Sequence, residues 1–107
     1  MIGRAAFAGL IVASAASATG AAQAGDRALG EYLAGECVTC HQLAAPARDG
    51  IPAIVGWPDE QFVAVLKSYR LKERDNPIMQ TVAARLSDEE MEALAAYFGS
   101  VAAEAAR

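Results

Sequence analysis

The segment Cys37-Val38-Thr39-Cys40-His41 constrains the fold more than any other feature, because it holds both cysteines and the single histidine of the 107-residue chain. A disulfide between Cys37 and Cys40 explains the two thiols but leaves the adjacent His41 without a role. A thioredoxin-like redox pair expects a βαβ context, which this sequence lacks. A zinc site needs about four ligands, and these cysteines and the histidine supply only three. The pattern therefore favours a group that uses all three side chains at once.

Cys-x-x-Cys-His is the attachment pattern of covalently bound haem. Two thiols at this spacing can each form a thioether to one of the two haem vinyl groups. The next residue then brings an imidazole to the iron on the same face of the ring. The sequence predicts one haem c, attached through Cys37 and Cys40, with His41 as a ligand of the iron.

The second axial ligand cannot be a histidine of this chain, because His41 is the only one. Met91 lies on the apolar face of an expected helix, which predicts a place in the core. Met79 follows Asn76-Pro77 in an expected loop, and a loop can swing a thioether across the haem. We therefore predict Met79 as the sixth ligand, since His/Met ligation raises the reduction potential and favours electron transfer. If Met79 does not bind, the alternative is a haem enzyme or gas sensor with an open sixth position.

The first 24 residues have the organisation of a secretory signal peptide. Sixteen of the residues in Met1–Ala24 are apolar, and Arg4 is the only charged one. Arg4 fits the n-region, Ala5–Ala16 the h-region and Ala22-Gln23-Ala24 the cleavage site. The uncharged stretch Ala5–Gly25 is also long enough to span a bilayer, so a retained anchor is the alternative. We predict cleavage and export to the periplasm, with no membrane span afterwards.

The remaining residues, 25–107, carry thirteen acidic and eight basic side chains, which gives a formal charge of −5. An acidic balance argues against nucleic-acid binding, which usually needs a basic surface. A domain of this size often needs a disulfide, metal or cofactor to fold. Alanine supplies 26 positions of the whole chain, and a methyl group buries little area. We therefore expect the haem to fill the centre of the domain.

Three stretches have the period of a helix. The first is Asp26–Gly35, with Asp26 as its N-cap. The second begins at Pro58, and the third begins at Ser87 with a capping box closed by Glu90. The residues expected to face the core share this period: Ala28, Leu29, Tyr32 and Leu33; Phe62, Val63, Val65, Leu66 and Tyr69; and Met91, Leu94, Ala95 and Phe98.

Two long loops, Gln42–Trp57 and Leu71–Leu86, separate these helices. The second contains the turn pattern Asp75-Asn76-Pro77, and a short helix is expected after Met79. No stretch alternates with the period of a strand. We predict an all-α domain with few helices, whose long loops wrap around the haem.

The chain resembles class I c-type cytochromes over Gly25–Arg107. The resemblance rests on the attachment motif, on Met79, and on Leu86-Ser87-Asp88-Glu89-Glu90 followed by Leu94-Ala95-Ala96-Tyr97-Phe98. More narrowly, Ile51–Gly56 and Phe62–Arg70 are similar to the cytochrome subunit of flavocytochrome c sulfide dehydrogenases and to short cytochromes of the c4 type.

This resemblance implies that the first and last helices pack together, with Gly30 against Tyr97 or Phe98. It also implies that His41 donates its Nδ1–H to a loop carbonyl, for which Pro52 is the candidate.

The function implied is periplasmic electron transfer by a monohaem carrier that is not itself an enzyme, its iron cycling between Fe(III) and Fe(II). Partners would be redox proteins such as a terminal oxidase. The alternative makes the chain the haem subunit of a flavoprotein sulfide dehydrogenase complex.

Basic and aromatic residues precede Met79. The resemblance implies candidate donors to the haem propionates around the Met79 loop, namely Trp57, Tyr69, Arg70 and Arg74. Lys67, Arg70, Lys72 and Arg74 form a cationic cluster. This cluster is interpreted either as a rim that steers an acidic partner or as a solvated helix end.

Overall fold

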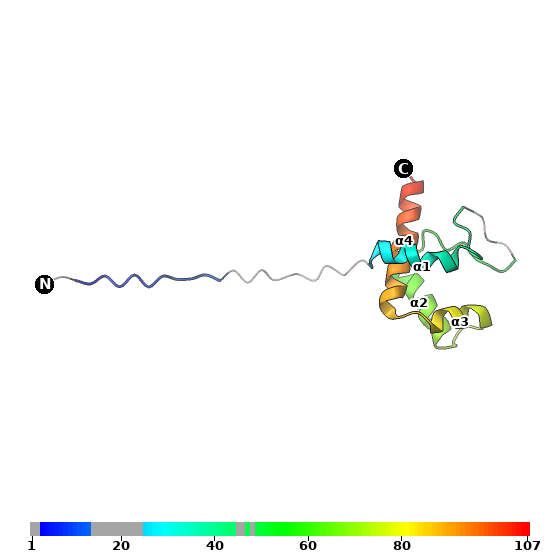
Figure 1. Ribbon diagram of the computed structural model, residues 1–107, viewed down its shortest axis with the longest axis horizontal. Coiled ribbons are helices and arrows are strands. Elements are labelled where there is room, and N and C mark those ends of the chain that lie inside the picture. Colours follow the sequence, from blue (N-terminus) through cyan, green and yellow to red (C-terminus); the bar gives the residue numbers. More distant parts are fainter. Residues whose placement is uncertain (1–2, 14–24, 45–46, 48) are drawn as a thin grey trace.

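The computed structural model describes residues 3–13, 25–44, 47 and 49–107. These residues form four helices and no strand: α1 Arg27–Cys37, α2 Asp59–Arg70, α3 Pro77–Ala84 and α4 Asp88–Ala105 (Figure 1). The prediction of an all-α domain is confirmed.

Residues 3–13, near the start of the chain, do not belong to the helical part of the structure. Residues 3–13 form no helix, and their side chains are exposed. The expected cleavage site, Ala22-Gln23-Ala24, lies outside the described residues. In the part of the chain that the structure describes, no helix is long and apolar enough to cross a membrane.

The predicted helix caps are confirmed. Asp26 Oδ1 accepts hydrogen bonds from the backbone N–H groups of Ala28 at 3.0 Å and Leu29 at 3.2 Å. Ser87 Oγ accepts from Glu90 N at 3.1 Å, while Glu90 Oε1 accepts from Ser87 N at 2.9 Å. These contacts satisfy N–H groups that have no partner inside their helix, and so they fix where α1 and α4 begin.

Helices α1 and α4 cross in close contact at Gly30. A Cβ atom at Gly30 would collide with the carbonyl oxygen of Ala93 and would lie 2.8 Å from Tyr97 Cβ. The predicted pairing of Gly30 with an aromatic residue of the last helix is confirmed, and Tyr97 is that residue. Only glycine permits this approach of the two backbones.

The expected apolar face of α1 is wrong in part. Tyr32 is 82% exposed and Leu29 is 36% exposed, whereas the buried residues of α1 are Gly30 and Ala34. The prediction placed the larger hydrophobic side chains of α1 in the core. The structure buries its smallest residues instead, because large side chains at the crossing would hold α1 and α4 apart.

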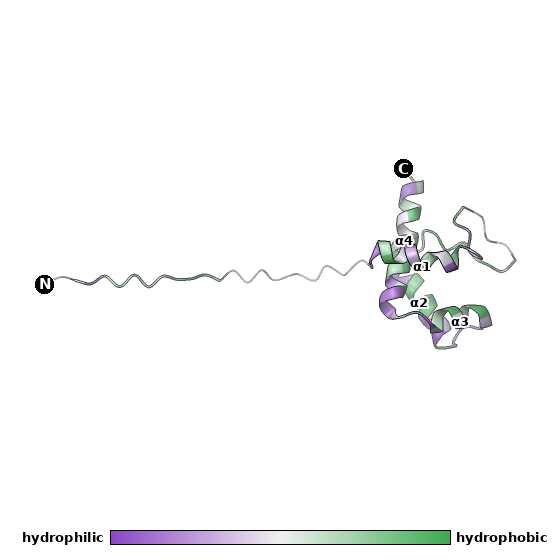
Figure 2. Cartoon of the chain, viewed as in Figure 1, coloured by the Kyte–Doolittle hydropathy of each residue, from purple (hydrophilic) through white to green (hydrophobic). Residues whose placement is uncertain are grey.

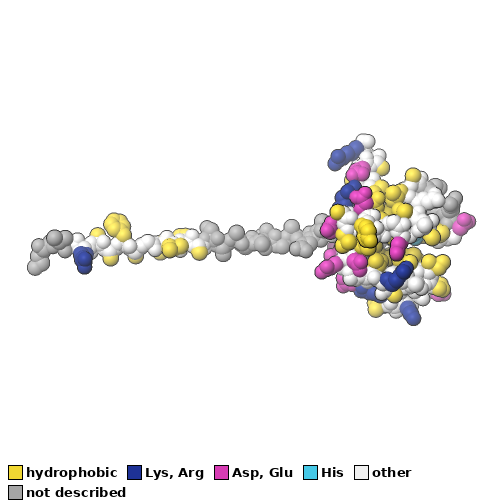
Figure 3. Space-filling view, in the orientation of Figure 1, with side chains coloured by type: hydrophobic (Ala, Val, Ile, Leu, Met, Phe, Trp, Pro, Cys, Tyr) yellow, Lys and Arg dark blue, Asp and Glu magenta, His cyan; other side chains and the backbone are white. Residues whose placement is uncertain are grey.

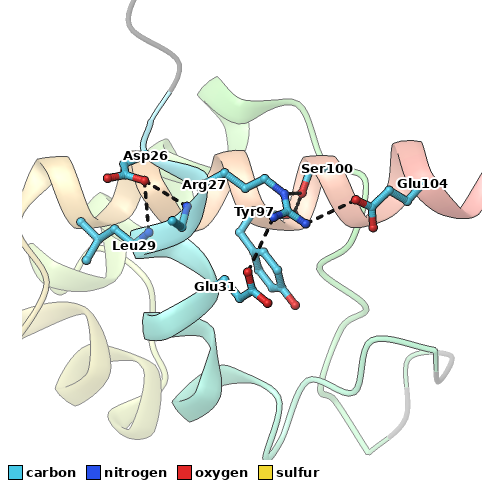
Figure 4. A network of polar contacts seen from close by, with 8 residues as sticks. Asp26, Arg27, Leu29, Glu31, Tyr97, Ser100 and Glu104 are labelled. Atoms are coloured by element: carbon cyan, nitrogen blue, oxygen red, sulfur yellow. Dashed lines mark hydrogen bonds and ion pairs between the residues drawn. The ribbon is translucent and has the colours of Figure 1, made fainter.

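Polar contacts surround the same crossing (Figure 4). Arg27 Nε donates to Ser100 Oγ at 2.8 Å, and its guanidinium pairs with Glu104 at 3.3 Å and with Glu31 at 3.6 Å. The Arg27 guanidinium also lies 5.8 Å from the centre of the Tyr97 ring. One side chain of the first turn of α1 thus ties this helix to the end of α4.

The core is centred on α4. Met91, Leu94 and Phe98 are at most 1% exposed. Phe98 stacks against Phe62 of α2 with 5.6 Å between ring centres. The first turn of α4 is hydrophilic and its middle is apolar (Figure 2). The predicted place of Met91 in the core is confirmed.

Candidate functional site

The segment Cys37–His41 forms a single turn at the end of α1. Cys37 is the last residue of the helix, and its carbonyl oxygen accepts from Cys40 N at 3.2 Å and from His41 N at 2.8 Å. Thr39 Oγ1 donates to Glu36 O at 2.6 Å. The two thiols and the imidazole are therefore carried on five consecutive residues of a hydrogen-bonded turn.

The two thiols differ in their surroundings and are not joined in a disulfide. Cys37 is half-buried, whereas Cys40 is exposed. Burial, aided by the charge of Glu36, raises the pKa of the Cys37 thiol to about 11. A thioredoxin-like pair needs an attacking thiol with a lowered pKa, so this environment argues against disulfide exchange.

His41 has a fixed orientation. Its Nδ1 lies 2.8 Å from the carbonyl oxygen of Pro52. A carbonyl oxygen only accepts hydrogen bonds, so Nδ1 carries the hydrogen and the neutral ring has its lone pair on Nε2. This is the arrangement that a metal-binding imidazole usually has. The predicted contact between His41 and Pro52 is confirmed.

The loop that presents the Pro52 carbonyl is itself anchored. Trp57 Nε1 donates to Ala53 O at 3.0 Å, and the Trp57 ring meets the Phe62 ring edge-on with 6.4 Å between centres. Because the indole has a single N–H donor, Trp57 has none left for a propionate. The candidate role of Trp57 as a propionate donor is replaced by one in holding the loop against α2.

The predicted cationic cluster does not form one free patch. Arg70 donates to Leu86 O at 3.1 Å and pairs with Asp88 at 2.6 Å, and Lys67 lies 3.5 Å from the same carboxylate. The hydrogen bond from Arg70, with the charges of Lys67 and Arg70, holds the pKa of Asp88 below its ordinary value. Lys67 and Arg70 therefore connect the end of α2 to the start of α4.

Two of the four cations lie apart from that network. The Arg74 guanidinium sits 5.4 Å from the centre of the Tyr69 ring, and Lys72 is exposed. A docking rim of four cations is thus reduced to Lys72 and Arg74. Tyr69 packs against the core, as its place on the stripe of α2 predicts.

Met79 lies in a helix and not in a loop, which corrects the prediction. It is the third residue of α3, a helix that begins before it and not after it. Asn76 caps α3 and Pro77 occupies its first position, and both residue types favour a helix start. The Asn76-Pro77 pair that suggested a turn is therefore the start signal of the helix.

Met79 can still present a thioether from this position. Side chains of a helix lean toward its N-terminus, and Met79 stands in the first turn, where no earlier turn covers it. Its side chain is half-buried and packs against the same core cluster as Cys37, while Met91 is fully buried at 0% exposure. Of these two methionines, only Met79 has an accessible side chain.

The apolar surface near these residues is incompletely covered. In the described part of the chain nine apolar residues are buried, and four of them are alanines: Ala34, Ala83, Ala93 and Ala95. Larger apolar side chains that touch this core stay half-buried: Val38, Ile54, Val63, Tyr69, Met79 and Leu86. Figure 3 shows hydrophobic side chains at the surface of the helical part, among charged ones. Covering these side chains with a further apolar group would be favourable, because it removes apolar surface from water.

The donor set suits a haem better than a bare metal ion. Among the described residues, no three His, Cys, Asp or Glu side chains lie where they could hold one ion together. The motif instead offers two unpaired thiols and one imidazole with Nε2 available, and α3 adds a thioether. These are the groups that could attach a haem c and ligate its iron.

Comparison with known proteins gives one partial similarity. No protein-family model matches the chain. Over 62 residues, the chain is 45% identical to a protein of Stutzerimonas stutzeri (strain A1501) named thiosulfate dehydrogenase electron acceptor. The match covers 56% of this chain and 29% of that relative, so the chain spans less than a third of the relative's length.

Proposed function

We propose that this chain is a monohaem c-type cytochrome that carries electrons, with haem c attached to Cys37 and Cys40 and its iron bound by His41 and Met79. The observation that carries the proposal is the hydrogen bond of His41 Nδ1 to the Pro52 carbonyl at 2.8 Å. It leaves Nε2 free beside two unpaired thiols on the same turn. The bound haem would supply one-electron chemistry between Fe(III) and Fe(II).

The chain's own residues then have defined tasks. The Pro52 carbonyl orients the His41 ring and makes it a stronger donor. Met79 would supply a second ligand to the haem iron, and His/Met ligation would favour electron transfer over the binding of external ligands and raise the reduction potential. The half-buried apolar side chains, including Ile54 and Leu86, exclude water from the group. No set of acid, base and nucleophile is needed for this activity.

The partner that we propose is a dehydrogenase that oxidises a reduced sulfur compound. The relative's name describes an electron acceptor of thiosulfate dehydrogenase, and the matched segment is 45% identical. A haem subunit in a flavoprotein sulfide dehydrogenase complex is the second candidate, because the sequence resembles such subunits. We place the protein in the periplasm, where residues 1–24 would direct it.

The first experiment tests the cofactor and its ligands. The full-length chain is produced in a bacterium that attaches haem c, and the periplasmic product is analysed by mass and absorption. We expect one covalent haem and a Met–Fe(III) charge-transfer band that Met79→Ala abolishes and Met91→Leu preserves. A haem-free product would refute the cytochrome assignment, and loss of the band in Met91→Leu alone would refute the choice of methionine.

A second experiment separates the candidate roles. The oxidised holoprotein is mixed with a thiosulfate dehydrogenase and thiosulfate, and haem reduction is followed by stopped flow. Rapid reduction supports the proposed partner, whereas co-purification with a flavin-containing subunit supports the second candidate. Rapid binding of carbon monoxide by the reduced protein would instead indicate an open sixth position and overturn the carrier role.

A further inference from the structure

Among the described residues, Asn76 is the one whose side chain makes a hydrogen bond to the backbone of Met79. Its Oδ1 accepts from Met79 N at 3.0 Å, and its carbonyl oxygen accepts from Gln80 N at 2.9 Å. Asn76 thus contacts both residues that close the first turn of α3. An N-cap of this kind supplies an acceptor that the helix itself cannot provide.

A second contact fixes the same turn to the preceding loop. Gln80 Nε2 donates to Arg74 O at 2.9 Å. The Arg74 guanidinium in turn lies 5.4 Å from the centre of the Tyr69 ring on α2. The position of the Met79 backbone is therefore defined through Asn76 and Gln80 relative to the end of α2.

Helix α3 depends on these contacts more than a longer helix would. It has eight residues, and isolated helices shorter than about 12 residues are marginal in water. Pro77 at its first position has no N–H that needs an acceptor, whereas the N–H of Met79 in the same turn needs one from outside the helix. Loss of the Asn76 side chain would leave the N–H of Met79 without its acceptor and let the first turn fray.

We propose that Asn76 is a positioning residue that holds the Met79 thioether at the iron by capping the turn from which this side chain extends. The inference rests on the proposed function, because it requires a haem whose iron Met79 ligates. Asn76 itself does not touch the iron. It acts by stabilising the helical first turn in the ligated state, which an external ligand must disrupt to displace Met79.

Imidazole titration of the oxidised holoprotein, followed at the Met–Fe(III) charge-transfer band, tests this role. We expect Asn76→Ala to bind imidazole about fivefold more tightly than the wild type, a change that corresponds to about 1 kcal/mol. Asn76→Ser, which keeps a capping oxygen, should stay close to the wild type. If the alanine variant does not accumulate, Asn76→Gln is used, because glutamine is not an N-cap residue.

The matched control is Ser87→Ala, which removes the cap of α4 without touching Met79. It should lower thermal stability and leave imidazole affinity unchanged. Equal imidazole affinity in Asn76→Ala and the wild type would overturn the inference, and so would an equal rise in Ser87→Ala. A holoprotein whose band survives Met79→Ala would refute the ligand assignment and the role of Asn76 with it. A band that Met79→Ala abolishes, together with equal imidazole affinity in Asn76→Ala and the wild type, would refute the inference alone.

Discussion

The Nδ1 atom of His41 and the carbonyl oxygen of Pro52 are joined by a hydrogen bond of 2.8 Å across eleven residues of chain. The bond connects the turn at the end of α1 to a loop that Trp57 holds against α2. The orientation of the imidazole is therefore set by tertiary structure and not by the motif alone. Because Nδ1 makes this bond, the neutral ring can bind a metal only through the lone pair on Nε2.

We predict that Pro52→Gly loosens this bond while keeping the carbonyl group. Glycine frees a backbone angle that proline fixes, which costs about 0.5–1 kcal/mol. The Nδ1 proton of His41 in the reduced holoprotein should then exchange with solvent about two- to fivefold faster, as measured by NMR. Pro58→Gly, at the start of α2, is the control and should leave this exchange unchanged. Equal exchange in Pro52→Gly and the wild type would contradict the anchoring role of the loop.

The crossing of α1 and α4 gives a second prediction. Gly30→Ala places a methyl group against the carbonyl of Ala93, and this overpacking should lower the free energy of unfolding by about 2–3 kcal/mol. Gly35→Ala is a matched control on the same helix, because a Cβ there meets nothing within 4 Å. That control should be neutral or stabilising by up to about 1 kcal/mol. Denaturant unfolding of both holoproteins makes the comparison, and equal stabilities would refute the close crossing.

Local chemistry explains which features the sequence could predict. Asp26 and Ser87 each begin a helix through hydrogen bonds that span three residues, so their roles follow from short patterns. The contact between His41 and Pro52 was expected only from family resemblance, since nothing in the ten intervening residues specifies it. The presence of this hydrogen bond in the structure supports the resemblance at a point that short sequence patterns do not predict.

Tertiary contacts explain what could not be predicted. Tyr32 fits the apolar period of α1 and yet is exposed, because the crossing admits only Gly30 and Ala34. The ion pair of Arg70 with Asp88 joins residues eighteen apart that belong to different helices. The start of α3 was predictable in principle, since Asn76-Pro77 matches an N-cap followed by proline at the first position.

The end of α2 offers a stabilising substitution. Lys72 has a φ of 60°, its N–H donates to Tyr69 O at 3.0 Å, and Glu73 N donates to Ser68 O at 2.9 Å. This is a Schellman ending, in which glycine normally occupies the left-handed position. Lys72→Gly should raise the free energy of unfolding by about 0.5–1 kcal/mol. Glu73→Gly, one residue later, should lower stability instead, and the reverse order in thermal unfolding would contradict the backbone argument.

The pairing of Asp88 with Arg70 and Lys67 predicts a dependence on pH. The pKa of Asp88 is lowered in the folded protein, so its stabilising effect is present above the unfolded pKa, near 3.8. The effect is lost as the pH falls through the still lower folded value. Asp88→Asn should therefore melt at a lower temperature than the wild type between pH 5 and about pH 8, and the difference should shrink below about pH 3.8. A difference that persists at pH 2 would show that charge is not its cause.

The small size of the buried core leads to the prediction that most directly links fold and cofactor. Four of the nine buried apolar residues in the described part of the chain are alanines, and larger side chains around them remain half-buried. A domain of about 80 residues with so little buried surface has a small margin of stability. The variant Cys37→Ala/Cys40→Ala cannot attach haem and should lack most of the helical circular dichroism of the holoprotein. Cys40→Ala, which keeps one thioether, should retain helix if its haem stays bound, because covering the apolar surface matters more than the second bond. Native-like helix content in the haem-free double variant would show that the four helices fold without the group, and the core argument would then be wrong.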